Sequence, residues 1–134
     1  MRILLLVLTA LAILTALFVM VTGCGSPKND AKTEIKAYLT DYIAILDKMA
    51  TGIERATTAA EALTAIRDQV SPSRDVKKRG DALETKYPEE RKAYRTNFPE
   101  DAAKIEVLRK RIRAGIAKFE KDKSFSDELR KLGN

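Results

Sequence analysis

Residues 34–56, EIKAYLTDYIAILDKMATGIERA, carry the pattern that decides the fold. Apolar side chains recur here with alternating gaps of four and three residues, and this spacing places them on one face of an α-helix. The members of this apolar seam are Ile35, Leu39, Tyr42, Leu46, Met49, Ile53 and Ala56. The pattern predicts a long amphipathic helix, for which Asp30 is a suitable N-cap residue.

A second helix is expected after a turn near residues 56–58. The letters TAAE at residues 58–61 have the spacing of a capping box, in which the threonine and glutamate side chains satisfy free N–H groups at a helix start. The alternative is a single helix that continues without interruption to Val70. The residues expected to point inward after the turn are Leu63, Ile66 and Val70.

Three prolines mark further helix boundaries. Ser71 and Pro72 resemble a cap followed by a proline at the first helical position, so a helix with Val76 and Leu83 inward either restarts there or continues with a kink. The near-repeats YPEE at 87–90 and FPED at 98–101 each place an aromatic residue, a proline and two acids in sequence. Such acids suit the first turn of a helix, so we expect helices to restart at both prolines.

The last long helix is predicted from a second apolar stripe. Its members are Ile105, Leu108, Ile112, Ile116 and Phe119. Ser124 or Ser126 is expected to cap a final short turn that carries Leu129 and Leu132. Since no part of the chain after residue 24 alternates with period two, we expect an all-α domain over residues 30–134. Short connections favour a small antiparallel bundle of three main helices plus short pieces.

The N-terminal stretch is a different kind of segment. Residues 3–21 contain no charged side chain and follow Arg2, which is the layout of an export signal. A helix over this stretch is also about as long as the hydrocarbon core of a bilayer is thick. An uncleaved membrane-spanning anchor is therefore the alternative to a cleaved signal.

The end of this stretch, VTGC at residues 21–24, resembles the lipobox of bacterial prolipoproteins. The resemblance implies that residues 1–23 are a signal peptide cleaved between Gly23 and Cys24. It also implies that Cys24 carries the lipid. The turn-forming residues that follow, GSPKN at 25–29, predict that residues 24–29 form a flexible tether. Val21 stands where leucine is commoner, and the apolar stretch is longer than most signal cores. Because Gly25 rather than aspartate follows the cysteine, the resemblance favours the outer membrane if the organism is Gram-negative.

Composition excludes several chemistries. The chain has no histidine and only one cysteine, so a Ser-His or Cys-His nucleophile and a histidine-ligated zinc are ruled out. No glycine cluster has the spacing of a nucleotide-binding loop, and the acidic pairs are placed at expected helix starts. The net charge of +6 is too mild to imply nucleic-acid binding. We therefore expect no catalytic residues, no cofactor and no metal, which means a protein that is not an enzyme.

The strongest surface feature is a predicted basic helix over residues 104–123. Its basic residues far outnumber its acidic ones, and the candidates for contact with an anionic surface are Arg109, Lys110, Arg111, Arg113 and Lys118. The hypothesis is an exported lipoprotein, anchored to the membrane through its lipid, that acts as an interaction or scaffolding module for an envelope protein. The alternative function is binding of an anionic envelope polymer or lipid through this helix. A merely solvated face also explains the charges.

Overall fold

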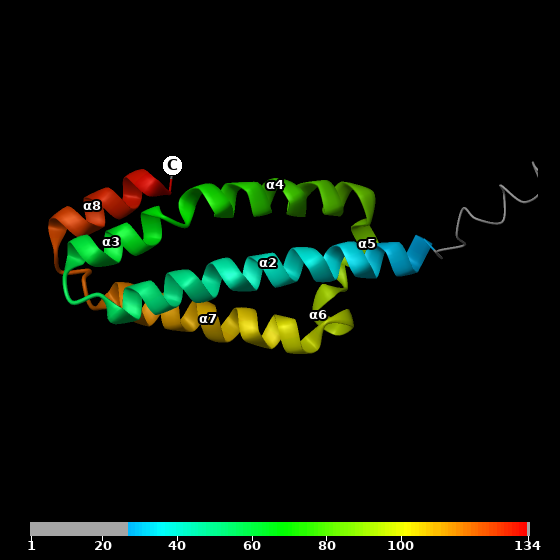
Figure 1. Cartoon of the computed structure of the whole chain (residues 1–134), viewed down its shortest axis with the longest axis horizontal. Coiled ribbons are helices and arrows are strands. Elements are labelled where there is room, and N and C mark those ends of the chain that lie inside the picture. The colour runs from blue at the N-terminus through cyan, green and yellow to red at the C-terminus, as the bar shows by residue number, and fades with distance from the viewer. Residues whose placement is uncertain (1–26, 134) are drawn as a thin grey trace, which may run out of the picture. The chain divides into compact units, whose positions relative to one another are not determined.

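The computed structural model describes residues 27–133 of the chain. Contacts divide the chain into two units, Met1–Asp30 and Ala31–Asn134. The described part of the second unit is an all-α helical bundle without a β-strand (Figure 1). None of the helices within residues 27–133 has both the length and the apolar run needed to cross a bilayer.

Three long helices and four shorter ones follow one another in the described residues. They are α2 (Pro27–Arg55), α3 (Ala59–Arg67), α4 (Val70–Lys86), α5 (Pro88–Lys92), α6 (Tyr94–Asn97), α7 (Pro99–Ala117) and α8 (Lys123–Leu132). The predicted bundle of three main helices plus short pieces is therefore confirmed, with α2, α4 and α7 as the main helices.

The first helix begins earlier than expected. Asp30 is not its N-cap but lies in its first turn, and Pro27 is its first residue. Residues 27–29, which were expected in the flexible tether, are therefore helical. Proline suits a helix start because its ring fixes φ at a helical value and the N–H it lacks would have no partner there. Asp30 still interacts favourably with the positive end of the helix dipole.

The turn between α2 and α3 is set by the predicted capping box. The backbone N–H of Glu61 donates to Thr58 Oγ1 over 3.2 Å, and the backbone N–H of Thr58 donates to Glu61 Oε2 over 3.3 Å. Glu61 also accepts from the backbone N–H of Thr57, and these hydrogen bonds hold the pKa of its carboxyl below the ordinary value. The alternative of a single helix to Val70 is excluded.

The later boundaries are partly as predicted. Pro88 and Pro99 each begin a helix, and the residues before them have nearly the same backbone angles, φ −136° with ψ 64° and φ −136° with ψ 63°. Pro72, in contrast, is not the first residue of α4, which begins at Val70 without a side-chain cap. The N-cap of α8 is Asp122, whose side chain accepts from the backbone N–H of Phe125, and not Ser124 or Ser126.

Ion pairs show how α4 and α7 run beside α2. Glu34 and Asp41 of α2 pair with Lys86 and Arg79 of α4, so these two helices are antiparallel. Contacts from α2 to α7 advance in the same direction along both helices. Lys36 pairs with the buried Asp101 over 2.5 Å, and Glu54 pairs with Arg111 over 2.6 Å. Helix α7 is therefore parallel to α2, and α2 lies between α4 and α7 (Figure 1).

The core of the described residues consists of two clusters along α2. One packs residues 35–50 of α2 against α4 and α7, and the other packs the C-terminal end of α2 against α3, α7 and α8. The apolar seam of α2 is wider than predicted. Tyr38, Ile45 and Ala50 are buried in addition to Ile35, Leu39, Leu46 and Ile53. The cause is the central position of α2, which has neighbours on two sides.

Candidate functional site

The lipid-anchor residues predicted from the sequence lie outside the described residues. Gly23 and Cys24 both precede Pro27, where the described part of the chain begins. Their assignment as cleavage site and lipidation site stays a prediction.

The basic segment 104–123 is not one helix. Helix α7 ends at Ala117, residues 118–122 form a turn, and α8 begins at Lys123. The reason is local, because Asp122 caps the start of α8 and Phe125 is buried with 1% of its surface exposed. The chain turns after α7, and this turn allows Phe125 of α8 to be buried in the core. The predicted continuous basic face is therefore interrupted after Ala117.

Arg111 is partly exposed, but its guanidinium binds two carboxylates of α2. Its Nε and Nη2 atoms donate to the two carboxylate oxygens of Glu54 over 2.7 and 2.6 Å, and Nη1 donates to Asp47 over 3.3 Å. The hydrogen bonds from Arg111 lower the pKa of the Glu54 carboxyl and raise that of Arg111 itself. Two parallel N–H···O bonds fix the relative position of the two helices. Arg111 is thus a structural residue.

Arg109 is also engaged within the bundle. Its Nη2 atom donates to the hydroxyl of Tyr42 over 3.1 Å, and Nη1 lies 3.5 Å from Glu106. The hydrogen bond with Tyr42 raises the pKa of the Arg109 guanidinium. Two of the five predicted contact residues therefore bind partners inside the protein.

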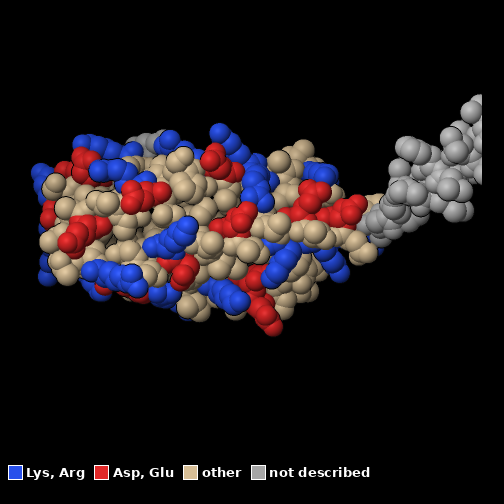
Figure 2. All heavy atoms as spheres, in the orientation of Figure 1, with Lys and Arg blue, Asp and Glu red and all other residues tan. Residues whose placement is uncertain are grey.

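The other three predicted contact residues remain at the surface. Lys110, Arg113 and Lys118 are exposed, and none of them forms an ion pair with another described residue. On the face shown in Figure 2, acidic and basic side chains are interspersed and do not separate into a large patch of one sign. The strongly basic helix face predicted from the sequence is therefore reduced to these residues and their neighbours.

A cluster that the sequence did not predict lies on α2 and the α5–α7 region. Three tyrosines and three arginines form a series of contacts that Glu106 closes, and we call this set the tyrosine–arginine cluster. Its members are Tyr38, Tyr42, Tyr94, Arg91, Arg95 and Arg109, with Glu106 as an ion-pair partner of Arg95 and Arg109.

Tyr38 and Tyr42 form the aromatic base of the cluster. Their rings are stacked with centroids 6.1 Å apart and an angle of 11° between their planes. Tyr38 is 7% exposed and belongs to the core, against which Tyr42 packs. Arg91 is three residues from Tyr94 and four from Arg95, and this spacing is the only sign in the sequence that these three side chains lie close together. The sequence does not show that they contact α2.

Arg91 is the most enclosed cation of the cluster. Its guanidinium carbon lies 4.9 Å from the centroid of Tyr38 and 5.2 Å from that of Tyr94, so two rings hold it. Its Nη2 atom donates to the Tyr38 hydroxyl over 3.3 Å. Its Nε–H is buried and has no acceptor among the described residues, nor does Arg91 form an ion pair with any of them. Arg91 therefore retains unused capacity to donate hydrogen bonds.

The tyrosine hydroxyls of the cluster also remain available as donors. Each hydroxyl oxygen accepts from an arginine, Tyr38 from Arg91, Tyr42 from Arg109 and Tyr94 from Arg95. A phenol that accepts in this way keeps its own proton free to donate. Burial raises the pKa of Tyr38, so this phenol stays protonated at neutral pH. The cluster is thus rich in hydrogen-bond donors.

A cavity of about 340 Å³ opens beside this cluster. Gly80 allows α4 to approach Tyr38, because a Cβ at this position would lie 3.0 Å from the ring. The residues that line the cavity are Tyr38, Tyr42, Ser73, Val76, Lys77, Gly80, Asp81, Glu84 and Arg91.

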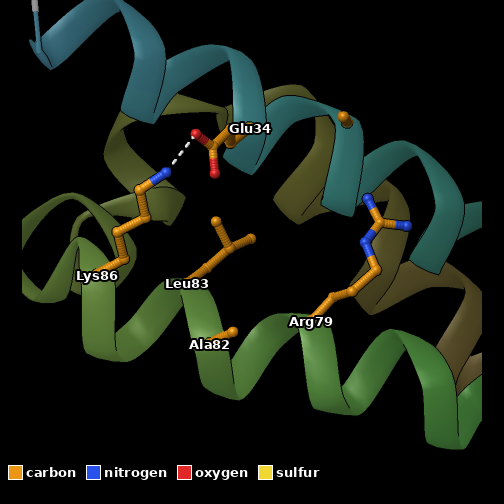
Figure 3. A pocket seen from close by; sticks show the side chains of 6 residues that line it. Glu34, Arg79, Ala82, Leu83 and Lys86 are labelled. Carbon is orange, nitrogen blue, oxygen red and sulfur yellow. Dashed lines mark hydrogen bonds and ion pairs between the residues drawn. The ribbon is translucent and has the colours of Figure 1, made fainter.

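Two shallow grooves flank α2 elsewhere. One, of about 260 Å³, lies between α2 and α4, with Leu83 in its floor and the ion pair of Glu34 with Lys86 at one end (Figure 3). The hydrogen bond with Lys86 lowers the pKa of Glu34. The other, of about 500 Å³, lies between α2 and α7 and contains the exposed Val107. Among the described residues that line these two grooves, no charged side chain without an ion-pair partner is as enclosed as Arg91.

The described residues contain no group of three or more cysteine, histidine, aspartate or glutamate side chains that could hold a metal ion. No family model, no curated protein and no solved structure matches the chain closely enough to indicate a relative.

Proposed function

We propose that this protein is a lipid-anchored envelope module that binds a partner and carries out no reaction itself. The observation that carries the proposal is the lipobox-like VTGC at residues 21–24, placed just before the helical bundle. Only residues 25 and 26 lie between Cys24 and Pro27, the first residue of α2. The chain from Cys24 to Pro27 reaches at most about 10 Å. The anchor therefore keeps the start of the bundle close to the membrane.

The direction of α7 bears on what the module contacts. Since α7 is parallel to α2, its C-terminal half lies at the end of α2 that is remote from Cys24 in the chain. A helix of this length extends by about 28 Å. The exposed Lys110, Arg113 and Lys118 thus lie at the end of the bundle that is remote from the start of α2. They are the surface that the module offers to an envelope partner or polymer.

The lipid anchor is tested by the substitution Cys24→Ala. We expect the wild-type protein to partition with membranes and to have the intact mass of residues 24–134 plus acyl chains. The variant should retain residues 1–23 and carry no lipid, because the modification that precedes cleavage needs the cysteine sulfur. Mass spectrometry of the membrane-extracted protein measures both. Ser26→Ala, at another small polar residue beside the anchor, is the matched control and should be processed normally.

An unlipidated, full-length mass in the wild type would refute the anchor. In that case residues 3–21 would be an uncleaved membrane segment, and the compartment of the bundle would have to be assigned from its orientation. Lipidation with retention in the inner membrane would leave the anchor but overturn the expected outer-membrane location.

Binding of an anionic polymer is the second candidate function, and the exposure of Lys110 and Arg113 without ion pairs supports it. We expect the double substitution Lys110→Glu, Arg113→Glu to weaken binding to dextran sulfate roughly 30-fold at low salt, since each cation near an anionic surface contributes about 1 kcal/mol. A salt series on a dextran sulfate column measures the change. Arg109 and Arg111 are left intact, because reversing them would break their contacts to α2.

The control for this experiment is Arg74→Glu, Lys78→Glu on α4. Arg74 and Lys78 are also exposed and form no ion pair with another described residue. Both double variants replace two basic residues with glutamate, so they change the net charge by the same amount. Equal weakening by both double variants would indicate attraction by net charge alone. It would remove the α7 surface as the binding site.

A further inference from the structure

We propose that the cavity beside the tyrosine–arginine cluster binds a small ligand that carries both a carboxylate and an ammonium group, namely a free amino acid or a short peptide. The inference goes beyond the proposed function and does not depend on the lipid anchor. It rests on the unpaired charges that line the cavity, on its aromatic wall and on its volume.

Arg91 supplies the carboxylate-binding side. Arg91 lines the cavity, and its guanidinium forms no ion pair with any described residue. Its Nε atom is buried too deeply for a ligand to reach, so a carboxylate in the cavity binds the Nη end of the guanidinium. A carboxylate is the acceptor that matches a guanidinium best, because it takes two parallel N–H···O bonds. The rings of Tyr38 and Tyr94 already hold Arg91 in place, so little freedom is lost when a ligand binds.

The opposite charge of the ligand follows from two carboxylates that line the same cavity. Asp81 pairs with Lys77 over 3.2 Å, whereas Glu84 has no ion pair with any described residue. A ligand with negative charge only would meet repulsion from Glu84. An ammonium group on the ligand converts this repulsion into attraction. The unpaired cation Arg91 and the unpaired anion Glu84 therefore match a zwitterion.

The walls and the size limit the rest of the ligand. Tyr38, Tyr42 and Val76 give the cavity an apolar side against which aliphatic or aromatic groups pack. Its volume of about 340 Å³ is at the lower end of the range for small-molecule sites. A single amino acid or a dipeptide suits such a volume better than a nucleotide or a folded partner.

The test uses alanyl-alanine as the probe with the full-length protein in detergent. Because its Nε–H is buried, Arg91 is expected to give a side-chain signal in ¹H–¹⁵N NMR spectra. We expect this signal to shift on titration, with a Kd of roughly 1 mM or below. N-acetyl-alanyl-alanine, which lacks the ammonium group, and alanyl-alanine amide, which lacks the carboxylate, should each bind at least tenfold more weakly.

Variants assign the two ends of the ligand. Arg91→Gln should abolish saturable binding, while Arg113→Gln, an equal loss of charge at an exposed site on α7, should leave the Kd within twofold. Glu84 is exposed, so Glu84→Gln should not disturb folding. Circular dichroism checks the folding of all three variants. It should remove the preference for alanyl-alanine over its N-acetylated form.

Three results would overturn the inference. They are an Arg91 Nε–H signal unmoved at 20 mM probe, equal binding of all three peptides, and unchanged binding after Glu84→Gln. None of these results bears on the lipid anchor, which the mass of the wild-type protein tests separately.

Discussion

Replacing Phe125 with alanine is expected to lower the free energy of unfolding by about 3–5 kcal/mol, the usual cost of emptying a buried phenylalanine site. Phe125 is 1% exposed and is the only fully buried side chain of α8 within the described residues. Its ring lies 5.6 Å from that of Phe119, with a 46° angle between the planes. Urea denaturation followed by circular dichroism measures the loss.

Val107→Ala is the control for Phe125→Ala. Val107 is 57% exposed, so its truncation should change the free energy of unfolding by less than about 0.5 kcal/mol. Because α8 ends the described chain, part of the effect of Phe125→Ala is expected as local detachment of α8. Amide hydrogen exchange in residues 123–132 should then rise more than in α2. A loss below about 1 kcal/mol, with unchanged exchange in α8, would show that Phe125 does not anchor this helix.

The sequence predicted the helices well because their boundaries depend on local chemistry. The capping box of Thr58 and the prolines Pro88 and Pro99 act through neighbouring residues only, and all three lie at the helix starts that were expected. The start of α8 was predicted wrongly, because several residues in a row are suitable caps and local chemistry does not distinguish them. Asp122 is the cap, and a helix that starts there places Phe125 in the core.

Features that depend on packing between helices could not be predicted from the sequence. The spacing of the α2 seam shows one buried face, but not that α4 and α7 lie on both sides of it and bury Tyr38 and Ile45 as well. The same holds for the basic residues of α7. Arg109 and Arg111 lie on the flanks of the helix that face Tyr42 and Glu54 of α2, and only the parallel packing of α7 on α2 makes these partners available.

The tyrosine–arginine cluster illustrates the same limit for a candidate site. Tyr38 and Arg91 are far apart in the sequence, and each is an ordinary residue in its own helix. They meet because α5 and α6 follow α4 at the end of the bundle where α2 begins. Gly80 contributes as well, since it leaves room for the Tyr38 ring against α4. The unpaired Nε–H of Arg91 exists only in this arrangement.

Gly52→Val is expected to lower the free energy of unfolding by about 2–3 kcal/mol. Helix α2 contacts α3 at Gly52, where even a single Cβ atom would lie 2.6 Å from the Cβ of Ala65. Both atoms are attached directly to the backbone, so no side-chain rotation relieves the overlap, and the two helices must separate. Separation exposes Ile53 and Leu63, which are buried next to this contact. Urea denaturation followed by circular dichroism gives the size of the loss.

A double-mutant cycle with Ala65→Gly distinguishes this overlap from a general effect of valine in the helix. Ala65→Gly alone should cost about 1 kcal/mol, because glycine is a poor helix residue. In combination with Gly52→Val it removes the facing methyl group, so the double variant should be more stable than the sum of the single losses by about 1–2 kcal/mol. Gly133→Val is the matched control, because the Cβ at this position would have no neighbour closer than 3.7 Å. Strictly additive losses in the cycle would mean that α2 and α3 do not touch at Gly52, and the close approach at this end of the bundle would have to be rejected.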